Sequence, residues 1–193
     1  MAKPFFILAS SSPRRSSLLA DIGVVPDKVI AAEVDEAPVP HELPRKMAGR
    51  LALAKLQAVL PSCDPKAIVM AADTVVGCGR RILPKADTPQ EVRDFLGLLS
   101  GRRHHVYTAV ALRSPGGKIM QRLADSLVTF KRLTEAEIEA YAQSGEGIGK
   151  AGGYAIQGRA AAYIRFIAGS YSNIVGLPLF EVAQMLRQCG YPL

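Results

Sequence analysis

The sequence contains few of the residues that form disulfides or bind zinc. Its 193 residues include only three cysteines, Cys63, Cys78 and Cys189, and three histidines. The cysteines are odd in number, far apart and without a C-x-x-C pair, which argues for reduced thiols and against both a disulfide framework and a zinc site. The histidines show no metal-binding spacing, and we expect the adjacent His104 and His105 to be structural. These features predict a reducing, cytoplasmic environment.

Long apolar runs are also absent. No stretch reaches the roughly 18 uncharged apolar residues that a membrane-spanning helix needs. The apolar run at residues 5–9 is shorter than the ~7 residues typical of a signal peptide. Internal repeats, low-complexity tracts and Gly/Ser linkers are missing as well. The sequence therefore predicts a single domain over residues 1–193 and no membrane partner.

Aromatic residues make up 6% of the chain, and tryptophan is absent. The sequence contains 24 Lys and Arg residues but only 17 Asp and Glu residues. The resulting net charge of +7 favours an anionic partner. Nucleic-acid-binding surfaces combine basic side chains with aromatic residues that stack on bases, and no such stripe occurs in this sequence. We expect no nucleic acid partner, although the charge leaves open a nucleotide-sensing or nucleic-acid-binding protein without catalytic activity.

The pattern of apolar residues predicts a sheet. Short apolar runs predict strands at residues 5–9, 67–72, 106–112, 121–130 and 160–168. The second of these strands is expected to stop at Asp73. The third and fourth are joined through a Ser-Pro-Gly-Gly turn, which is typical of an antiparallel pair and indicates a mixed sheet.

Helix signals occur between these strands. Ser12 is an N-cap followed by proline, and Thr88 and Thr134 open capping boxes. Amphipathic spacing predicts further helices at residues 44–60 and 179–190. Strands interleaved with helices define an α/β protein, which we expect to form a mixed, twisted sheet flanked by helices.

The first candidate site is the turn at residues 10–15, Ser-Ser-Ser-Pro-Arg-Arg, between the first strand and the first helix. Hydroxyl groups and unpaired amides at a helix N-terminus favour anions. Arg14 and Arg15 oppose the helix dipole there, but they suit a phosphate that accepts charge-assisted hydrogen bonds. The turn thus predicts a phosphate site, and the alternative is a capped helix with two solvated arginines.

Carboxylates form the second group of candidates. Asp73, followed by Thr74, is expected at the end of a buried strand, where α/β sheets often bind ligands and magnesium. A turn Asp that caps the next element is the simpler alternative. Glu33, Asp35 and Glu36 lie within four residues, and either a divalent cation or bulk water would relieve their repulsion.

Two lysines and a glycine-rich segment complete the candidates. Lys55 and Lys85 lie beside apolar residues, where a snorkelling lysine explains each about as well as a phosphate ligand does. Residues 147–158, G-I-G-K-A-G-G-Y-A-I-Q-G, match neither a Walker A nor a Rossmann pattern. Their glycines indicate either close approach to a ligand or a mobile loop. The Gln157 amide can pair with the edge of uracil or thymine.

The order of these segments resembles that of the Maf family of nucleoside triphosphate pyrophosphatases over nearly the whole chain. The matching segments are SSSPRR at 10–15, VDE at 34–36, ALAK at 52–55, ADTVV at 72–76, ILPK at 82–85, positions within 100–108, GGYAIQG at 152–158 and NIVGLPL at 173–179. The AIQG sequence at residues 155–158 is similar to the branch of the family that acts on dTTP and UTP rather than on 7-methyl-GTP.

This resemblance implies a Maf/ITPase-like fold with a central cleft. It implies hydrolysis of dTTP, UTP or modified pyrimidine nucleotides to a nucleoside monophosphate and diphosphate. A divalent cation, Mg²⁺ or Mn²⁺, would be held by Glu36 and Asp73, with Asp73 as the catalytic proton acceptor. The substrate-binding residues that the resemblance implies are Ser10, Arg14, Arg15, Lys55, Thr74, Lys85 and Gln157. Among these, the family uses the positions of Arg14, Thr74 and Gln157 for substrate choice.

Two points qualify what the resemblance implies. The family usually has Gly-Lys-Pro where this chain has Pro84, Lys85 and Ala86, so the turn that carries the lysine should differ. Family members often form dimers, which leaves a homodimer open for this protein.

Overall fold

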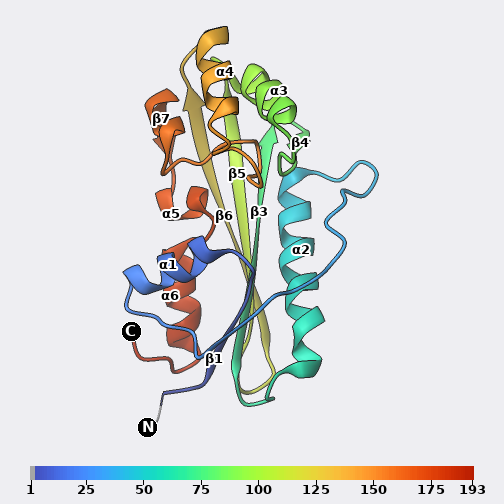
Figure 1. The fold of residues 1–193 in the computed structure, drawn as a ribbon. Helices are drawn as coiled ribbons and strands as arrows, with labels where there is room; N and C mark the ends of the chain where they lie inside the picture. The colour runs from blue at the N-terminus through green and yellow to red at the C-terminus, as the bar shows by residue number, and fades with distance from the viewer. Residues whose placement is uncertain (1–2) are drawn as a thin grey trace.

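A computed structural model describes residues 3–193, and its centre is a mixed seven-stranded sheet (Figure 1). The strands are β1 (Phe6–Ala9), β2 (Lys28–Ile30), β3 (Ile68–Cys78), β4 (Arg81–Leu83), β5 (Arg103–Arg113), β6 (Ile119–Phe130) and β7 (Ile164–Ala168). Their order is β2-β1-β3-β5-β6-β7, with β4 paired to β3. β1 runs parallel to β2 and β3, whereas β3, β5, β6 and β7 pair antiparallel in turn. The prediction of a mixed α/β sheet is therefore confirmed.

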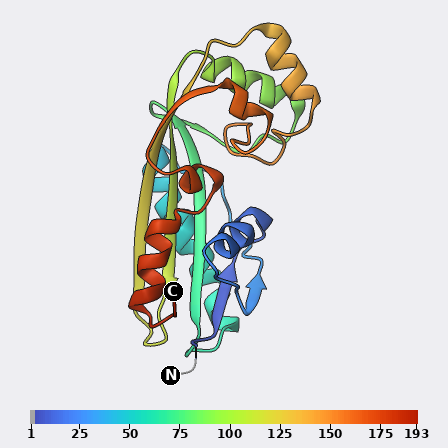
Figure 2. The same ribbon diagram turned by 90° about the vertical axis from the view of Figure 1, so that its left-hand side faces the viewer.

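Helices cover both faces of this sheet. They are α1 (Pro13–Asp21), α2 (Pro44–Val59), α3 (Pro89–Leu99), α4 (Glu135–Gln143), α5 (Tyr171–Val175) and α6 (Leu179–Gln188), with short 3-10 helices η1 (Leu60–Ser62) and η2 (Arg159–Tyr163). α3 and α4 pack together at one end of the long strands, and α1 and α6 lie nearer the other end (Figures 1 and 2). No helix in residues 3–193 is long and apolar enough to cross a membrane.

The core consists of two apolar clusters, one on each face of the sheet. Along β1, Phe6 and Leu8 join one cluster and Ile7 and Ala9 join the other, because successive side chains of a strand face opposite sides. α2 packs in the second cluster, whereas α1, α3 and α6 pack in the first. Both faces of β1 are thus buried, which explains the uninterrupted apolar run at the start of the chain.

The prediction that the strand at residues 67–72 stops at Asp73 is wrong. β3 continues to Cys78, and Asp73 pairs with Ala109 in a long antiparallel ladder with β5. The β-branched Thr-Val-Val sequence after Asp73 favours a strand and extends the ladder. Asp73 is therefore held in the middle of the sheet and not in a turn, so the alternative of a turn Asp that caps the next element is wrong as well.

The strand predicted at residues 160–168 is only partly correct. Its first residues form the 3-10 helix η2, and β7 begins at Ile164. The three consecutive alanines in η2 have little preference for a strand, which explains the difference. The capping boxes predicted at Thr88 and Thr134 are confirmed, since each hydroxyl accepts a hydrogen bond from the backbone three residues later.

Candidate active site

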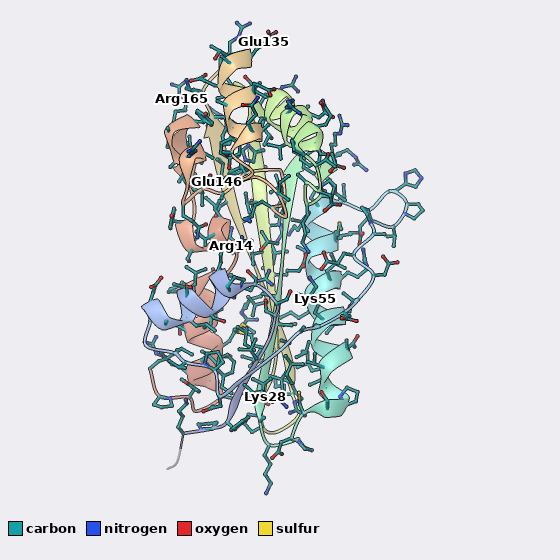
Figure 3. All side chains as sticks on the ribbon, viewed as in Figure 1. Arg14, Lys28, Lys55, Glu135, Glu146 and Arg165 are labelled. Atoms are coloured by element: carbon teal, nitrogen blue, oxygen red, sulfur yellow. The ribbon has the colours of Figure 1, made fainter. Side chains whose placement is uncertain are left out.

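A cavity of about 310 Å³ lies where the β1–α1 turn, β3, α2, α5 and the glycine-rich segment meet. Figure 3 shows Arg14 and Lys55 midway between Glu135 at one end of the molecule and Lys28 at the other. Every residue that the sequence predicts for the site lines this one cavity. These residues are Ser10, Arg14, Arg15, Glu36, Lys55, Asp73, Thr74, Lys85 and Gln157.

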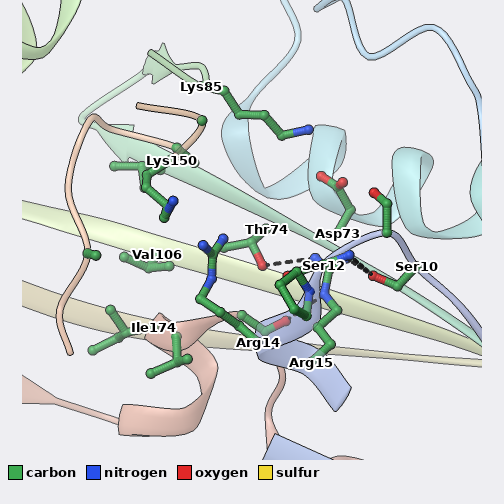
Figure 4. A pocket seen from close by; sticks show the side chains of 18 of the residues that line it. Ser10, Ser12, Arg14, Arg15, Asp73, Thr74, Lys85, Val106, Lys150 and Ile174 are labelled. Carbon is green, nitrogen blue, oxygen red and sulfur yellow. Dashed lines mark hydrogen bonds between the residues drawn. The ribbon is translucent and has the colours of Figure 1, made fainter. Parts of the chain in front are cut away.

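The β1–α1 turn holds Arg15 in a fixed, buried position. The guanidinium, in a residue only 9% exposed, donates from Nε to the Gly176 carbonyl at 3.0 Å and from Nη1 to Ser10 Oγ at 3.0 Å. Burial lowers the pKa of Arg15, the direction expected for a cation removed from water. The alternative of two solvated arginines is therefore wrong for Arg15. Arg14, its neighbour, extends into the cavity (Figure 4).

The first turn of α1 is open toward the same cavity. α1 begins at Pro13 as predicted, but the Ser12 side chain makes no capping hydrogen bond. Ser11 and Ser12 line the cavity. Unpaired amides and hydroxyl groups at a helix N-terminus are well placed to bind an anion.

Four ionic side chains form an alternating chain across the cavity wall. Lys85 Nζ lies 2.6 Å from Glu36 Oε2, and Lys55 Nζ lies 2.6 Å from Glu36 Oε1 and 2.5 Å from Asp73 Oδ1. Lys55 is 7% exposed and Asp73 is 5% exposed. Because α2 packs on β3, the Lys55 ammonium is directed onto Asp73 and not outward to water, so the snorkelling alternative for Lys55 is wrong.

The two carboxylates in this row of ion pairs, Glu36 and Asp73, differ in their affinity for protons. Burial raises the pKa of Asp73, and the opposing charges of Lys55 and Arg15 compensate only in part. Burial also acts on Glu36, but its hydrogen bonds to Lys55 and Lys85 prevail and lower its pKa. Asp73 is consequently the better proton acceptor of the pair.

Thr74 connects the cavity to the core behind it. Its Oγ1 accepts a 3.4 Å hydrogen bond from Arg15 Nη2 and lies 2.9 Å from Thr108 Oγ1. Thr108 in turn donates to the Asn173 carbonyl at 2.9 Å. The buried Asn173 amide donates to Val106 O and to a serine hydroxyl on β6. α5 therefore supports the side chains of Thr74 and Thr108. The sequence indicated Thr108 and Asn173 only because they lie in segments that match the family.

The glycine-rich segment is attached to β4 and to the residues that follow it. Gly152 N donates to the carbonyls of Leu83 and Pro84, and Ala86 N donates to the Lys150 carbonyl. This attachment brings Lys85 and the segment to the same side of the cavity. Gln157 lies exposed at the cavity, at the far end of the segment.

Lys150 also lines the cavity, and the sequence reasoning missed it. A signal was available, because Lys150 is the only cationic residue among residues 147–158. The adjacent histidines lie outside the cavity, as expected for structural residues. His104 is buried with Nε2 2.7 Å from Tyr154 Oη, and burial lowers its pKa to about 4.

The predicted metal ligands, Glu36 and Asp73, present their oxygens close together, since both contact the same Lys55 nitrogen. Mg²⁺ and similar hard cations bind one or two carboxylates and complete their coordination with water and phosphate oxygens. Within residues 3–193, no group of three His, Cys, Asp or Glu side chains is arranged for a metal ion. The donor set fits a cation that binds together with an oxygen-rich anion.

Buried and cavity-facing arginines beside a helix N-terminus bind phosphate groups, and a carboxylate with a raised pKa nearby can accept a proton. The fold and the cavity together define an α/β protein with a cationic, carboxylate-containing cavity suited to phosphate groups. More specifically, the chain belongs to the Maf family, whose model, described as Maf-like protein, matches residues 5–189.

Close relatives share about half of their residues with this chain over nearly their full length. A Sphingopyxis alaskensis protein called dTTP/UTP pyrophosphatase is 54% identical over 190 residues, which cover 98% of this chain and 99% of the relative. A Paramagnetospirillum magneticum protein of the same name is 57% identical over 185 residues, covering 96% and 97%. Among solved structures, the Staphylococcus aureus Ham1 protein is 15% identical with a TM-score of 0.45, covering 65% and 71% of the two chains.

Proposed function

We propose that this protein hydrolyses the pyrimidine nucleoside triphosphates dTTP and UTP to a nucleoside monophosphate and diphosphate. The observation that carries the proposal is the convergence around one cavity of all the catalytic, substrate-binding and metal-binding residues that the family resemblance implies. The names of relatives that are about half identical over nearly their whole length support the same substrates.

The cations best placed to bind phosphate are those that have no carboxylate partner within residues 3–193. Arg14 and Arg15, at the positive N-terminal end of α1, would hold phosphate oxygens by charge-assisted hydrogen bonds. These contacts stabilise charge that develops on the phosphate oxygens in the transition state. Gln157 would pair with the N3–H and O4 edge of the pyrimidine, which is the interaction that its amide can make.

In the hydrolytic step, water attacks the α-phosphorus, and the bond from this atom to the bridging oxygen of the leaving diphosphate breaks. Asp73 would accept the proton of that water, because its raised pKa makes it a better base than an ordinary Asp. Lys55, which donates to Asp73, orients the carboxylate. A bound Mg²⁺ or Mn²⁺, held by Glu36 and Asp73, would neutralise phosphate charge and make the water more acidic.

The test is the product spectrum of the purified protein with Mg²⁺ or Mn²⁺ and either UTP or dTTP. We expect monophosphate and diphosphate in equal amounts, whereas stepwise release of orthophosphate would refute the proposal. Asp73→Asn should lower kcat by about 10²- to 10³-fold, the typical effect of removing one catalytic partner. The matched control is Asp125→Asn, which alters a carboxylate paired with His105 outside the cavity and should retain activity.

The alternative of a non-catalytic nucleotide-sensing or nucleic-acid-binding protein has no specific observation in its favour. The homodimer, the cytoplasmic location and the single-domain organisation stay predictions.

A further inference from the structure

The cations around the cavity fall into two groups. Lys55 and Lys85 are neutralised by Glu36 and Asp73. Across residues 3–193, by contrast, no carboxylate lies within 4.0 Å of the charged nitrogens of Arg14, Arg15 or Lys150. A folded protein that concentrates uncompensated positive charge in one cavity is arranged for an anion.

Lys150 and Arg14 face one another across this cavity. In Figure 4 both side chains end in the space between them, Lys150 from the glycine-rich segment and Arg14 from α1. Burial and the nearby Arg14 charge lower the pKa of Lys150, the direction expected for two cations placed in this way. Within residues 3–193, the ammonium donates to one group, the Ile148 carbonyl, at 3.1 Å. An anion between Lys150 and Arg14 would replace this repulsion with two attractive contacts.

The backbone that carries Lys150 is fixed before any ligand binds. Its carbonyl accepts hydrogen bonds from Ala86 N and Gly153 N, and its own N–H donates to Gly147 O. A cation on a fixed backbone loses less conformational entropy on binding than one on a loose loop. Lys150 is therefore preorganised at this position.

The surroundings indicate which anionic group occupies this gap. The apolar side chains of Val106 and Ile174 lie on the same side of the cavity as Lys150, and Asp73 and Ser10 lie on the opposite side (Figure 4). A nucleotide that places its base against the apolar side and its triphosphate toward Asp73 would have its α-phosphate in between, where the side chains of Lys150 and Arg14 end. Resting on the proposed function, we infer that Lys150 is a substrate-binding residue which, with Arg14, binds the α-phosphate of the nucleotide.

The experiment measures binding without turnover. Uridine 5′-monophosphate and uridine are titrated into the wild-type protein, Lys150→Met, Lys150→Arg and the control Lys118→Met, whose lysine lies exposed in the β5–β6 hairpin. Lys150→Met should weaken the affinity for uridine 5′-monophosphate by about 10- to 100-fold, which corresponds to the loss of one hydrogen bond to a charged group. Uridine binding should stay unchanged, Lys150→Arg should restore part of the loss, and Lys118→Met should behave as wild type.

Three results would overturn the inference. The first is equal affinity of the wild type and Lys150→Met for the monophosphate. The second is a loss of uridine affinity in Lys150→Met as large as the loss of monophosphate affinity. The third is no measurable binding of the monophosphate by the wild type. Thermal unfolding of each variant guards against misfolding, and we expect no loss of stability because the ammonium bonds only one carbonyl. Failure of the wild type to hydrolyse UTP would refute the proposed function separately, since the binding data do not depend on catalysis.

Discussion

Glu36 and Asp73 accept hydrogen bonds from the same Lys55 ammonium, yet their pKa values move in opposite directions. The difference lies in burial. Asp73 is enclosed on β3, so the loss of hydration raises its pKa by more than its cationic neighbours lower it. Glu36 is partly hydrated and contacts two lysines, which together lower its pKa. The protein thereby holds one carboxylate with a raised pKa and one with a lowered pKa next to each other.

This difference predicts that pH has opposite effects on the stability of two conservative variants, Asp73→Asn and Glu36→Gln. A raised pKa means that Asp73 stabilises the folded state below its unfolded pKa of 3.8, and that this contribution is lost as pH rises through the folded pKa. A lowered pKa means that the Glu36 contribution is present above 4.5 and is lost as pH falls through the folded pKa. Relative to wild type, Asp73→Asn should therefore gain stability, and Glu36→Gln should lose it, as pH rises.

Urea unfolding of the three proteins at several values between about pH 3 and pH 7 measures this effect as a difference in the free energy of unfolding. Asp125→Asn, in an exposed carboxylate on β6, controls for the general effect of removing a negative charge. Parallel pH dependences for Asp73→Asn and Glu36→Gln would contradict the assignment of burial to one carboxylate and ion pairing to the other.

At the scale of elements, the sequence predicted best where the signals are local. Capping boxes act within one turn of helix, and both were found at Thr88 and Thr134. The predicted end of the strand at Asp73 was wrong, because the ladder that continues β3 pairs with β5 residues such as Thr108 and His105, which are far away in the sequence. Long-range pairing of this kind overrides the breaking tendency of a single Asp.

The same limit applies to the site. No local spacing indicates that Lys55 and Asp73 will meet, because α2 must first pack on β3. The family resemblance supplied that convergence, and where it named no residue, as at Lys150, the sequence reasoning missed a side chain that lines the cavity. The glycine pattern was visible, but its attachment to β4 was not.

The glycine-rich segment depends on Gly152. Its φ is +70°, and an added Cβ would lie 2.9 Å from a Val76 methyl group on β3. Gly152→Ala should cost about 1–2 kcal/mol for the left-handed backbone and about 1–3 kcal/mol for overpacking. Since the segment carries Lys150 and Gln157, the variant should also bind nucleotide more weakly.

Gly149 is the matched control for that prediction. It has a φ of +69° but open space around its Cβ position, so Gly149→Ala should show the backbone cost alone. The midpoints of thermal unfolding compare the two variants. Equal destabilisation would show that the contact between Gly152 and Val76 contributes nothing beyond backbone strain.

For the molecule as a whole, a net charge of +7 does not by itself distinguish a mononucleotide from a nucleic acid. Its distribution does, because Arg14, Arg15 and Lys150 face a single cavity of about 310 Å³. That volume suits one small molecule and not a polymer strand, which needs a continuous groove. The positive charge should therefore act on nucleotides individually.

A ligand that binds only the folded protein stabilises it, and at 100 times its dissociation constant the gain is about 2.7 kcal/mol. For a chain of this length, that gain corresponds to a rise of about 5–10 °C in Tm. We expect this rise with α,β-methylene-UTP and Mg²⁺ in about 0.15 M salt, where weak surface attraction is largely screened. Single-stranded DNA at the same phosphate concentration should leave Tm unchanged, because a cavity of about 310 Å³ suits one small molecule and not a polymer strand. An equal or larger rise with DNA would mean that the charge on the outer surface, and not the cavity, determines what the protein binds.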